Sequence, residues 1–130
     1  MKYILVVILG LLISSFALAE TNREVYVFST DWCLYCKLLK IHILSDDRVI
    51  KSLEDYKLRY IDTDKHRDIL PEWQIRTIPE IVIADRINKN KAIIVTRWKL
   101  RNMKENDSES YERNIQSLLE VLKKNSPKKD

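Results

Sequence analysis

The chain has 130 residues, 45% of them hydrophobic, and a formal net charge of +4 at neutral pH. This length fits one domain, and the mild charge, with both signs interspersed, argues against a nucleic-acid-binding surface. Gly10 is the only glycine. Glycine-rich phosphate loops, dinucleotide-binding fingerprints and the nucleophile elbow are therefore excluded, because each of them needs glycine.

The first 19 residues have the three parts of a secretory signal peptide. Lys2 is the basic start, residues 4–12 form a short apolar run, and Ala17-Leu18-Ala19 is a small-residue cleavage site. We therefore predict cleavage near Ala19 and export to the periplasm or the medium. The alternative is an uncleaved N-terminal anchor. The mature protein would consist of one domain, residues 20–124, and a polar, disordered tail, residues 125–130.

The predicted elements have the order β-α-α-β-α-β-β-α, which indicates an α/β fold with a mixed sheet and helices on both faces. They are a strand at 25–28, helices at 33–44 and 46–56, a strand at 58–61, a helix at 64–74, hairpin strands at 81–83 and 92–95, and a helix around 111–122. The apolar positions of the first helix are Leu34, Leu38, Ile41 and Leu44, and those of the second are Val49, Ile50, Leu53 and Tyr56.

Residue types at the element ends predict caps and turns. Ser45 is the expected N-cap of the second helix, and Ser108 or Ser110 that of the last helix. With no glycine in the domain, Asn88 and Asn90 are the residues placed to supply positive φ in the hairpin connection.

The stretch Trp32-Cys33-Leu34-Tyr35-Cys36 holds the only two cysteines, where the first predicted strand gives way to a helix. Cys33 would lie at the helix start, where free backbone N–H groups and the helix dipole stabilise a thiolate. Cys36 would lie one turn on, close enough to form a reversible disulfide. A loop of two residues constrains the unfolded chain very little, so a structural staple is the weaker alternative. The motif predicts a redox-active pair in an oxidising compartment.

A second motif, Ile78-Pro79, stands just before the first hairpin strand, where a proline does not interrupt a sheet ladder. WCxxC at a strand–helix junction, followed about 40 residues later by Ile-Pro, resembles the thioredoxin superfamily, in particular its exported bacterial members. The resemblance implies a thioredoxin-like fold and thiol–disulfide oxidoreductase activity on protein disulfides or dithiols. It also implies a cis Ile78–Pro79 bond, for which an ordinary trans proline is the alternative.

The resemblance implies roles for five residues of this chain. Cys33 would be the attacking thiolate and Cys36 the resolving thiol. Trp32, Ile78 and Pro79 would form the substrate-binding surface, where an extended partner segment pairs with the backbone of Ile78.

The chain departs from thioredoxins at two places near the cysteines. Val27 aligns with the buried acid of thioredoxins, so the resemblance does not extend to an acid-assisted proton relay. Leu34-Tyr35 is neither the Gly-Pro of thioredoxin nor the Pro-His of the periplasmic oxidase, so neither redox potential carries over. The absence of a histidine between the cysteines, and an isoleucine before the proline, favour a reductase or an electron relay. We expect a monomer without a cofactor, supplied with electrons by a membrane electron-transfer reductase.

Two other functional classes stay open. Cys33 and Cys36 together with His42 or His66 would suit copper or zinc, although the spacing is not that of a zinc finger, and we assign no metal ligand. The domain could also be a binding module that uses the site only to grip a partner. The charged segment from Lys99 to Ser110 is longer than in a minimal thioredoxin and is either a specificity loop or a solvated connection.

Overall fold

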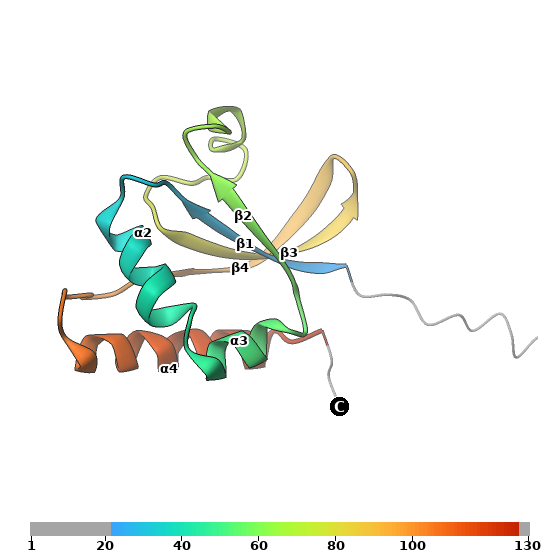
Figure 1. Cartoon of the computed structure of the whole chain (residues 1–130). Helices are drawn as coiled ribbons and strands as arrows, with labels where there is room; N and C mark the ends of the chain where they lie inside the picture. The colour runs from blue at the N-terminus through green and yellow to red at the C-terminus, as the bar shows by residue number, and fades with distance from the viewer. Residues whose placement is uncertain (1–21, 128–130) are drawn as a thin grey trace, which may run out of the picture.

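The computed structural model describes residues 22–127, so the predicted signal peptide lies outside the described residues. Within this range a four-stranded mixed sheet has the strand order β2-β1-β3-β4 (Figure 1). β1 pairs with β2 in parallel and with β3 antiparallel, and β4 pairs antiparallel with β3. The elements are β1 (Arg23–Ser29), α2 (Leu34–Leu38), η1 (Leu39–Ile43), α3 (Asp47–Leu53), β2 (Lys57–Asp62), η2 (Arg67–Ile69), β3 (Glu80–Asn88), β4 (Lys91–Lys99) and α4 (Ser108–Lys124).

The two central strands are β1 and β3, and both are buried along most of their length. A strand that is covered on both faces reads as a continuous apolar run, which is why 25–28 and 81–83 could be predicted as strands. The prediction of an α/β fold with a mixed sheet is confirmed.

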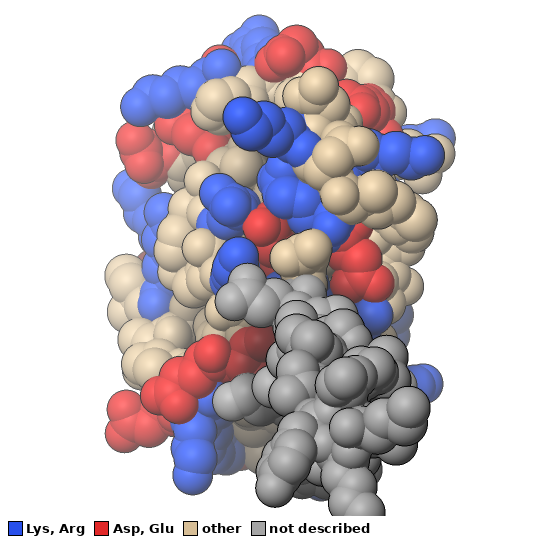
Figure 2. All heavy atoms as spheres, turned by 90° about the vertical axis from the view of Figure 1, so that its right-hand side faces the viewer, with Lys and Arg blue, Asp and Glu red and all other residues tan. Residues whose placement is uncertain are grey.

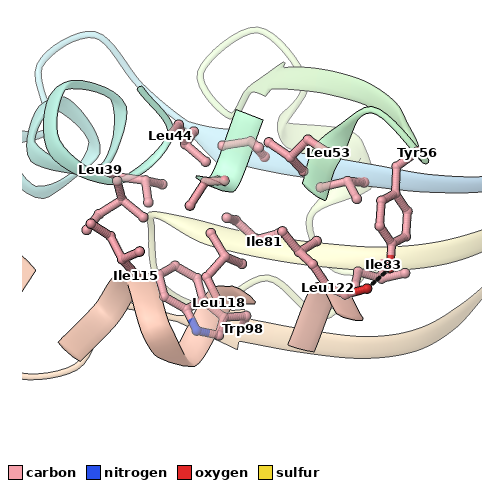
Figure 3. Packing of buried hydrophobic residues seen from close by; sticks show 14 of the residues in the cluster. Leu39, Leu44, Leu53, Tyr56, Ile81, Ile83, Trp98, Ile115, Leu118 and Leu122 are labelled. Carbon is pink, nitrogen blue, oxygen red and sulfur yellow. Dashed lines mark hydrogen bonds between the residues drawn. The ribbon is translucent and has the colours of Figure 1, made fainter. Parts of the chain in front are cut away.

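The main core lies between the sheet and α2, η1, α3 and α4, all of which cover one face (Figure 1). Val25, Val27, Ile81 and Ile83 point from the sheet into this core. Figure 3 shows Ile81 and Ile83 facing residues of α3 and α4, and shows the Tyr56 hydroxyl, which donates to the Leu122 carbonyl at 2.6 Å. The fully buried side chains from η1 and the helices include Leu39, Ile43, Val49, Leu118 and Leu122.

The helix after the cysteines changes its turn partway, which corrects its predicted buried face. After Leu38 the chain continues as a π-helix, and the Leu44 N–H donates to the Leu39 carbonyl at 2.8 Å. Of the predicted apolar positions, Leu38 and Leu44 are buried as expected, whereas Leu34 and Ile41 are exposed. Leu39 and Ile43 are completely buried in their place. Ile50 of α3 is exposed as well.

The opposite face of the sheet is covered by residues 63–79, which contain only the short 3-10 helix η2. The helix predicted at 64–74 is therefore wrong. The Asp64 N–H bonds to the Asp62 side chain instead of starting a helix, and Gln74 has φ +55°. Ile69 and Trp73 pack on Tyr26 and Phe28 of β1, so this segment closes the second face without an α-helix. The α-helices of the described residues therefore cover one face of the sheet and not, as predicted, both faces.

The predicted caps and turn residues are each displaced by a short distance. Asp46, not Ser45, caps α3, and Asp107 caps α4 in place of Ser108 or Ser110. Asn88 and Asn90 form an Asx turn in which the Asn88 side chain accepts from the Asn90 N–H. The positive φ values fall elsewhere among the described residues, at Gln74, Asn102 and Asn106.

The end of α4 is ordered beyond the predicted domain boundary at Lys124. Asn125 caps α4, and its carbonyl accepts from Arg23 Nη1 at 2.9 Å. Residues 128–130 of the predicted tail lie outside the described part of the chain. None of the helices between residues 22 and 127 is long and apolar enough to cross a membrane.

Candidate active site

The two cysteines meet where β1 ends and α2 begins. Cys33 is the N-cap of α2, and its sulfur accepts a hydrogen bond from the Cys36 N–H at 3.2 Å. Both residues are free thiols, and their exposed fractions are 7% for Cys33 and 1% for Cys36. The expected pair at a helix start is therefore present, with the first sulfur on the outer side and the second sulfur underneath.

Cys36 is held in its protonated form. Burial is the main cause that raises the pKa of Cys36 to about 12, and the neighbouring Cys33 thiol adds to the effect. A hydrogen bond from the Thr30 backbone opposes the increase without cancelling it. Val27, at the position where thioredoxins carry an acid, is a fully buried core residue. Because a valine side chain has no titratable group, Val27 cannot accept a proton from Cys36.

Trp32 lies on the surface beside the cysteines, with 71% of its area exposed. Its indole N–H donates to Asp64 Oδ2 at 2.7 Å, which ties the ring to the segment that follows β2. Leu34 and Tyr35, between the cysteines, are about half exposed. The sulfur atoms are thus nearly enclosed within a rim of exposed apolar side chains.

A groove of about 260 Å³ runs past the cysteine motif. Tyr35 and the segment Thr77-Ile78-Pro79 form one side, and the Ile78–Pro79 peptide bond is cis. The other side consists of Lys99, Leu100, Asn102 and Met103. Three of the five residues expected at the site, Trp32, Cys33 and Cys36, are close in sequence. The structure brings the other two, Ile78 and Pro79 of the loop before β3, next to Tyr35 of this motif.

Sequence reasoning did not identify the second wall of this groove, which belongs to the segment from Lys99 to Ser110. Asn114 of α4 is buried and binds this segment through Arg101, accepting from its N–H at 2.9 Å and donating to its carbonyl at 3.0 Å. The Ser110 hydroxyl accepts from the Lys104 N–H at 3.2 Å. The segment is therefore anchored to α4 through the backbone of Arg101 and Lys104. Met103, the only apolar residue between Arg101 and Glu109, was the available signal.

The histidines considered for a metal site have other surroundings. His42 stacks on Tyr111 of α4, with ring centroids 4.0 Å apart, and the backbone N–H of His66 donates to the Asp62 carbonyl. Across residues 22–127, no group of three or more His, Cys, Asp or Glu side chains could hold a metal ion.

A CxxC pair at the start of a helix, next to a cis-proline loop on a mixed sheet, defines a protein with a thioredoxin-like fold. The family model described as Thioredoxin matches residues 15–117, which is most of the chain. The chain therefore belongs to the Thioredoxin family.

The similar proteins include thioredoxins and thiol:disulfide interchange proteins. The chain is 33% identical over 63 residues to the thiol:disulfide interchange protein DsbD of Campylobacter jejuni strain RM1221, a stretch that covers 47% of this chain and 10% of DsbD. It is 32% identical over 66 residues to a thioredoxin of Mycoplasmoides gallisepticum, covering 50% of this chain and 63% of that protein. The matched stretch is thus less than two thirds of the length of either relative.

Solved structures support the fold. A thioredoxin from Thermus thermophilus superimposes with a TM-score of 0.60 at 17% identity, covering 79% of this chain and 72% of that chain. The DsbH oxidoreductase superimposes with a TM-score of 0.54 at 16% identity, covering 78% of this chain and 74% of its own. At these identities the likeness concerns the fold alone.

Proposed function

We propose that this protein is an exported thiol–disulfide oxidoreductase that works as a reductase or electron relay. The observation that carries the proposal is the asymmetry of the pair. Cys33 is at the start of α2 with the Cys36 N–H on its sulfur, while Cys36 is buried beneath it with a pKa raised to about 12. The Cys33 sulfur is placed to react with a partner disulfide, and Cys36 stays a protonated thiol until the second step.

In the first step, the Cys33 thiolate attacks one sulfur of a partner disulfide. A bond forms between Cys33 and that sulfur, the partner's S–S bond breaks, and the partner's other sulfur leaves as a thiolate. The Cys36 N–H and the positive end of the helix at Leu34–Leu38 favour negative charge at the Cys33 position before attack.

In the second step, Cys36 loses its proton and attacks the Cys33 sulfur of the mixed disulfide. The Cys33–Cys36 disulfide forms, the second partner thiolate leaves, and two electrons have passed to the partner. Val27 offers no proton acceptor, so the departing partner thiolate or water takes the proton from Cys36. Proton removal from this buried thiol is therefore the step on which the chemistry depends most strongly.

Trp32, Ile78 and Pro79 form the surface that receives the partner in this proposal. The groove beside Tyr35 has an apolar wall from Leu100 and Met103, and is open enough for an extended segment. Main-chain pairing at Ile78 would fix the direction of that segment, and the groove would accept an apolar side chain next to the disulfide.

Export follows from the signal-peptide pattern of residues 1–19, and we propose the periplasm as the working compartment. An exported reductant needs an electron source across the membrane, so we propose a membrane electron-transfer reductase as the donor. The partial similarity to DsbD supports this setting.

The first experiment is a redox titration of the Cys33–Cys36 pair in thiol buffers, followed by tryptophan fluorescence. We expect a reversible two-electron transition near about −270 mV, as for thioredoxin, whereas a value near about −120 mV would assign the opposite direction. A matched pair of variants tests the roles. Cys36→Ser should accumulate a mixed disulfide with a partner, and Cys33→Ser should accumulate none. Absence of any reversible transition would refute the oxidoreductase proposal.

A further inference from the structure

A second hollow, of about 460 Å³, lies on the face of the sheet that residues 63–79 cover. We call it the far hollow. Its floor consists of Tyr26 and Phe28 of β1 and Trp73, whose rings lie 4.7 to 6.5 Å apart. Ile61 and Ile69 form one wall, and Ala92 and Ile94 of β4 form another. The volume is within the roughly 300–1,000 Å³ typical of small-molecule sites.

Cations surround the outer end of the far hollow. Arg86, Lys89 and Lys91 contribute to its lining, against one carboxylate, Glu72. A neighbouring depression of about 400 Å³ shares Arg86 and Lys89, adds Arg59, and has no carboxylate in its lining. Figure 2, which views the molecule from the right-hand side of Figure 1, shows Lys and Arg side chains gathered over the upper middle of this end.

A buried ion network holds two of these cations in place. Glu24, only 2% exposed, accepts from Arg59 Nε at 3.0 Å and from Arg86 Nε at 3.1 Å. Arg86 also donates to the Tyr26 hydroxyl at 2.6 Å and to the Lys89 carbonyl at 3.1 Å, which secures the hairpin turn. One carboxylate faces two guanidinium groups, so the Glu24–Arg59–Arg86 network itself carries one excess positive charge.

The cationic end of the far hollow is distant from the cysteines. Tyr26 and Glu24 belong to the first half of β1, and Cys33 follows the end of that strand. Since a strand advances about 3.3 Å per residue, the Glu24 network and the cysteine motif lie about 20 Å apart along the sheet. The Glu24–Arg59–Arg86 network takes no part in the thiol chemistry described above.

We propose that the far hollow binds a small amphipathic organic anion, with a ring or short acyl body on the aromatic floor and an acidic group beside Arg86, Lys89 and Lys91. Aromatic and aliphatic walls favour the apolar body, and a preorganised arginine with two lysines favours a carboxylate, sulfonate or phosphate. This inference does not depend on the proposed redox function.

Two dyes with the same ring system test the proposal on the full-length protein as it is purified. 8-Anilinonaphthalene-1-sulfonate carries the acidic group, and N-phenyl-1-naphthylamine lacks it. We expect the sulfonate dye to bind one molecule per chain at least about 10-fold more tightly than the neutral dye. We also expect this difference to shrink at high salt, because screening weakens exposed charge attraction.

Three variants place the binding. The double variant Lys89→Gln/Lys91→Gln should weaken sulfonate-dye binding by about 3–10-fold, in keeping with exposed charge pairs. Ala92→Phe, which fills the hollow, should abolish it. Lys99→Gln, which removes one lysine charge in the groove beside the cysteines, should leave it unchanged.

The proposal is overturned if the sulfonate dye does not bind, or if both dyes bind equally. Full affinity in folded Ala92→Phe, or a loss confined to Lys99→Gln, overturns it as well. Circular dichroism checks that each variant is folded. If Ala92→Phe is not, the lysine pair and the dye comparison decide, because those lysines are exposed and outside the core.

Discussion

Replacing Ile43 by alanine, and separately Ile41 by alanine, tests which face of η1 packs into the core. The two substitutions are chemically identical and lie two residues apart in η1. Ile43 is completely buried in the main core, whereas Ile41 is 61% exposed. A regular helical period from Leu34 and Leu38 predicts the reverse, with Ile41 on the buried face.

The expected difference in unfolding free energy follows from the carbon atoms removed. Isoleucine to alanine deletes three carbon groups, worth about 2.4 kcal/mol of transfer free energy when they are fully buried. The cavity left at Ile43 raises the cost to about 3–4 kcal/mol. At Ile41 the side chain is mostly solvated, so its removal costs less than about 1 kcal/mol of transfer free energy. The better helix propensity of alanine offsets this cost by about a few tenths of a kcal/mol.

Urea unfolding of the reduced proteins, followed by circular dichroism, measures both values. We expect the two variants to have equal m-values. Their unfolding free energies, calculated from the midpoints, should differ by about 2–3 kcal/mol. A difference below about 1 kcal/mol, or a larger loss for Ile41→Ala, would refute the burial of Ile43 in place of Ile41. If Ile43→Ala does not fold, Ile43→Val against Ile41→Val repeats the comparison, with about 0.5–1.5 kcal/mol expected at the buried site.

Three further predictions concern single buried groups. Because burial raises the pKa of Cys36 to about 12 from an ordinary 9.0, the folded state retains a proton that the unfolded state releases, so reduced protein should lose stability above pH 9. Relative to Cys36→Ser this loss should approach about 1.4 kcal/mol per pH unit up to pH 12, and parallel pH curves would contradict it. Burial acts to raise the pKa of Glu24, but hydrogen bonds from Tyr26, Arg59 and Arg86 outweigh it and lower the pKa. Glu24→Gln should therefore lower the unfolding free energy, measured by urea unfolding, by about 3 kcal/mol at pH 7. This loss should shrink as the pH falls through the acid range. The control Glu112→Gln, at an exposed ion pair, should cost less. Asn114→Ala should cost about 1–3 kcal/mol and speed amide hydrogen exchange at residues 100–107, whereas Gln116→Ala on the same helix should do neither.

The elements that could be predicted from the sequence are those defined by short-range pattern. β1 and β3 are continuous apolar runs, and the Cys33 cap follows from the CxxC motif at a strand–helix junction. The buried face of α2 and η1 could be predicted only in part, because Leu38 and Leu44 are buried as expected but Leu39 and Ile43 are buried instead of Leu34 and Ile41. The helix expected at 64–74 failed for a different reason. Its apolar residues fit a helical period, but they pack on Tyr26 and Phe28 from turns.

The helix starts show how close alternatives compete. Ser45 and Asp46 are adjacent residues of cap-forming type, and the sequence has no means of choosing between them. In the structure Asp46 also binds the Arg48 side chain, which favours Asp46 as the cap.

At the candidate site, local sequence predicted the cysteines, Trp32 and the Ile78–Pro79 loop, since each belongs to a recognisable motif. The wall made by Leu100 and Met103 depends on Asn114, which is more than ten residues away and binds backbone groups that have no sequence signature. The Glu24 network likewise joins β1, β2 and β3. Such contacts arise only once the sheet order is fixed.

Residues 63–79 contact both the groove beside the cysteines and the far hollow. Asp64 binds Trp32 and residues 77–79 line the groove, while Ile69 and Trp73 line the far hollow. The two sites therefore share one covering segment, and thermodynamic linkage applies to them. If oxidation of the cysteines changes affinity in the hollow by some factor, occupation of the hollow must shift the redox equilibrium by that same factor. A molecule bound in the far hollow, on one face of the sheet, would then regulate electron transfer at the cysteines, which follow the end of β1.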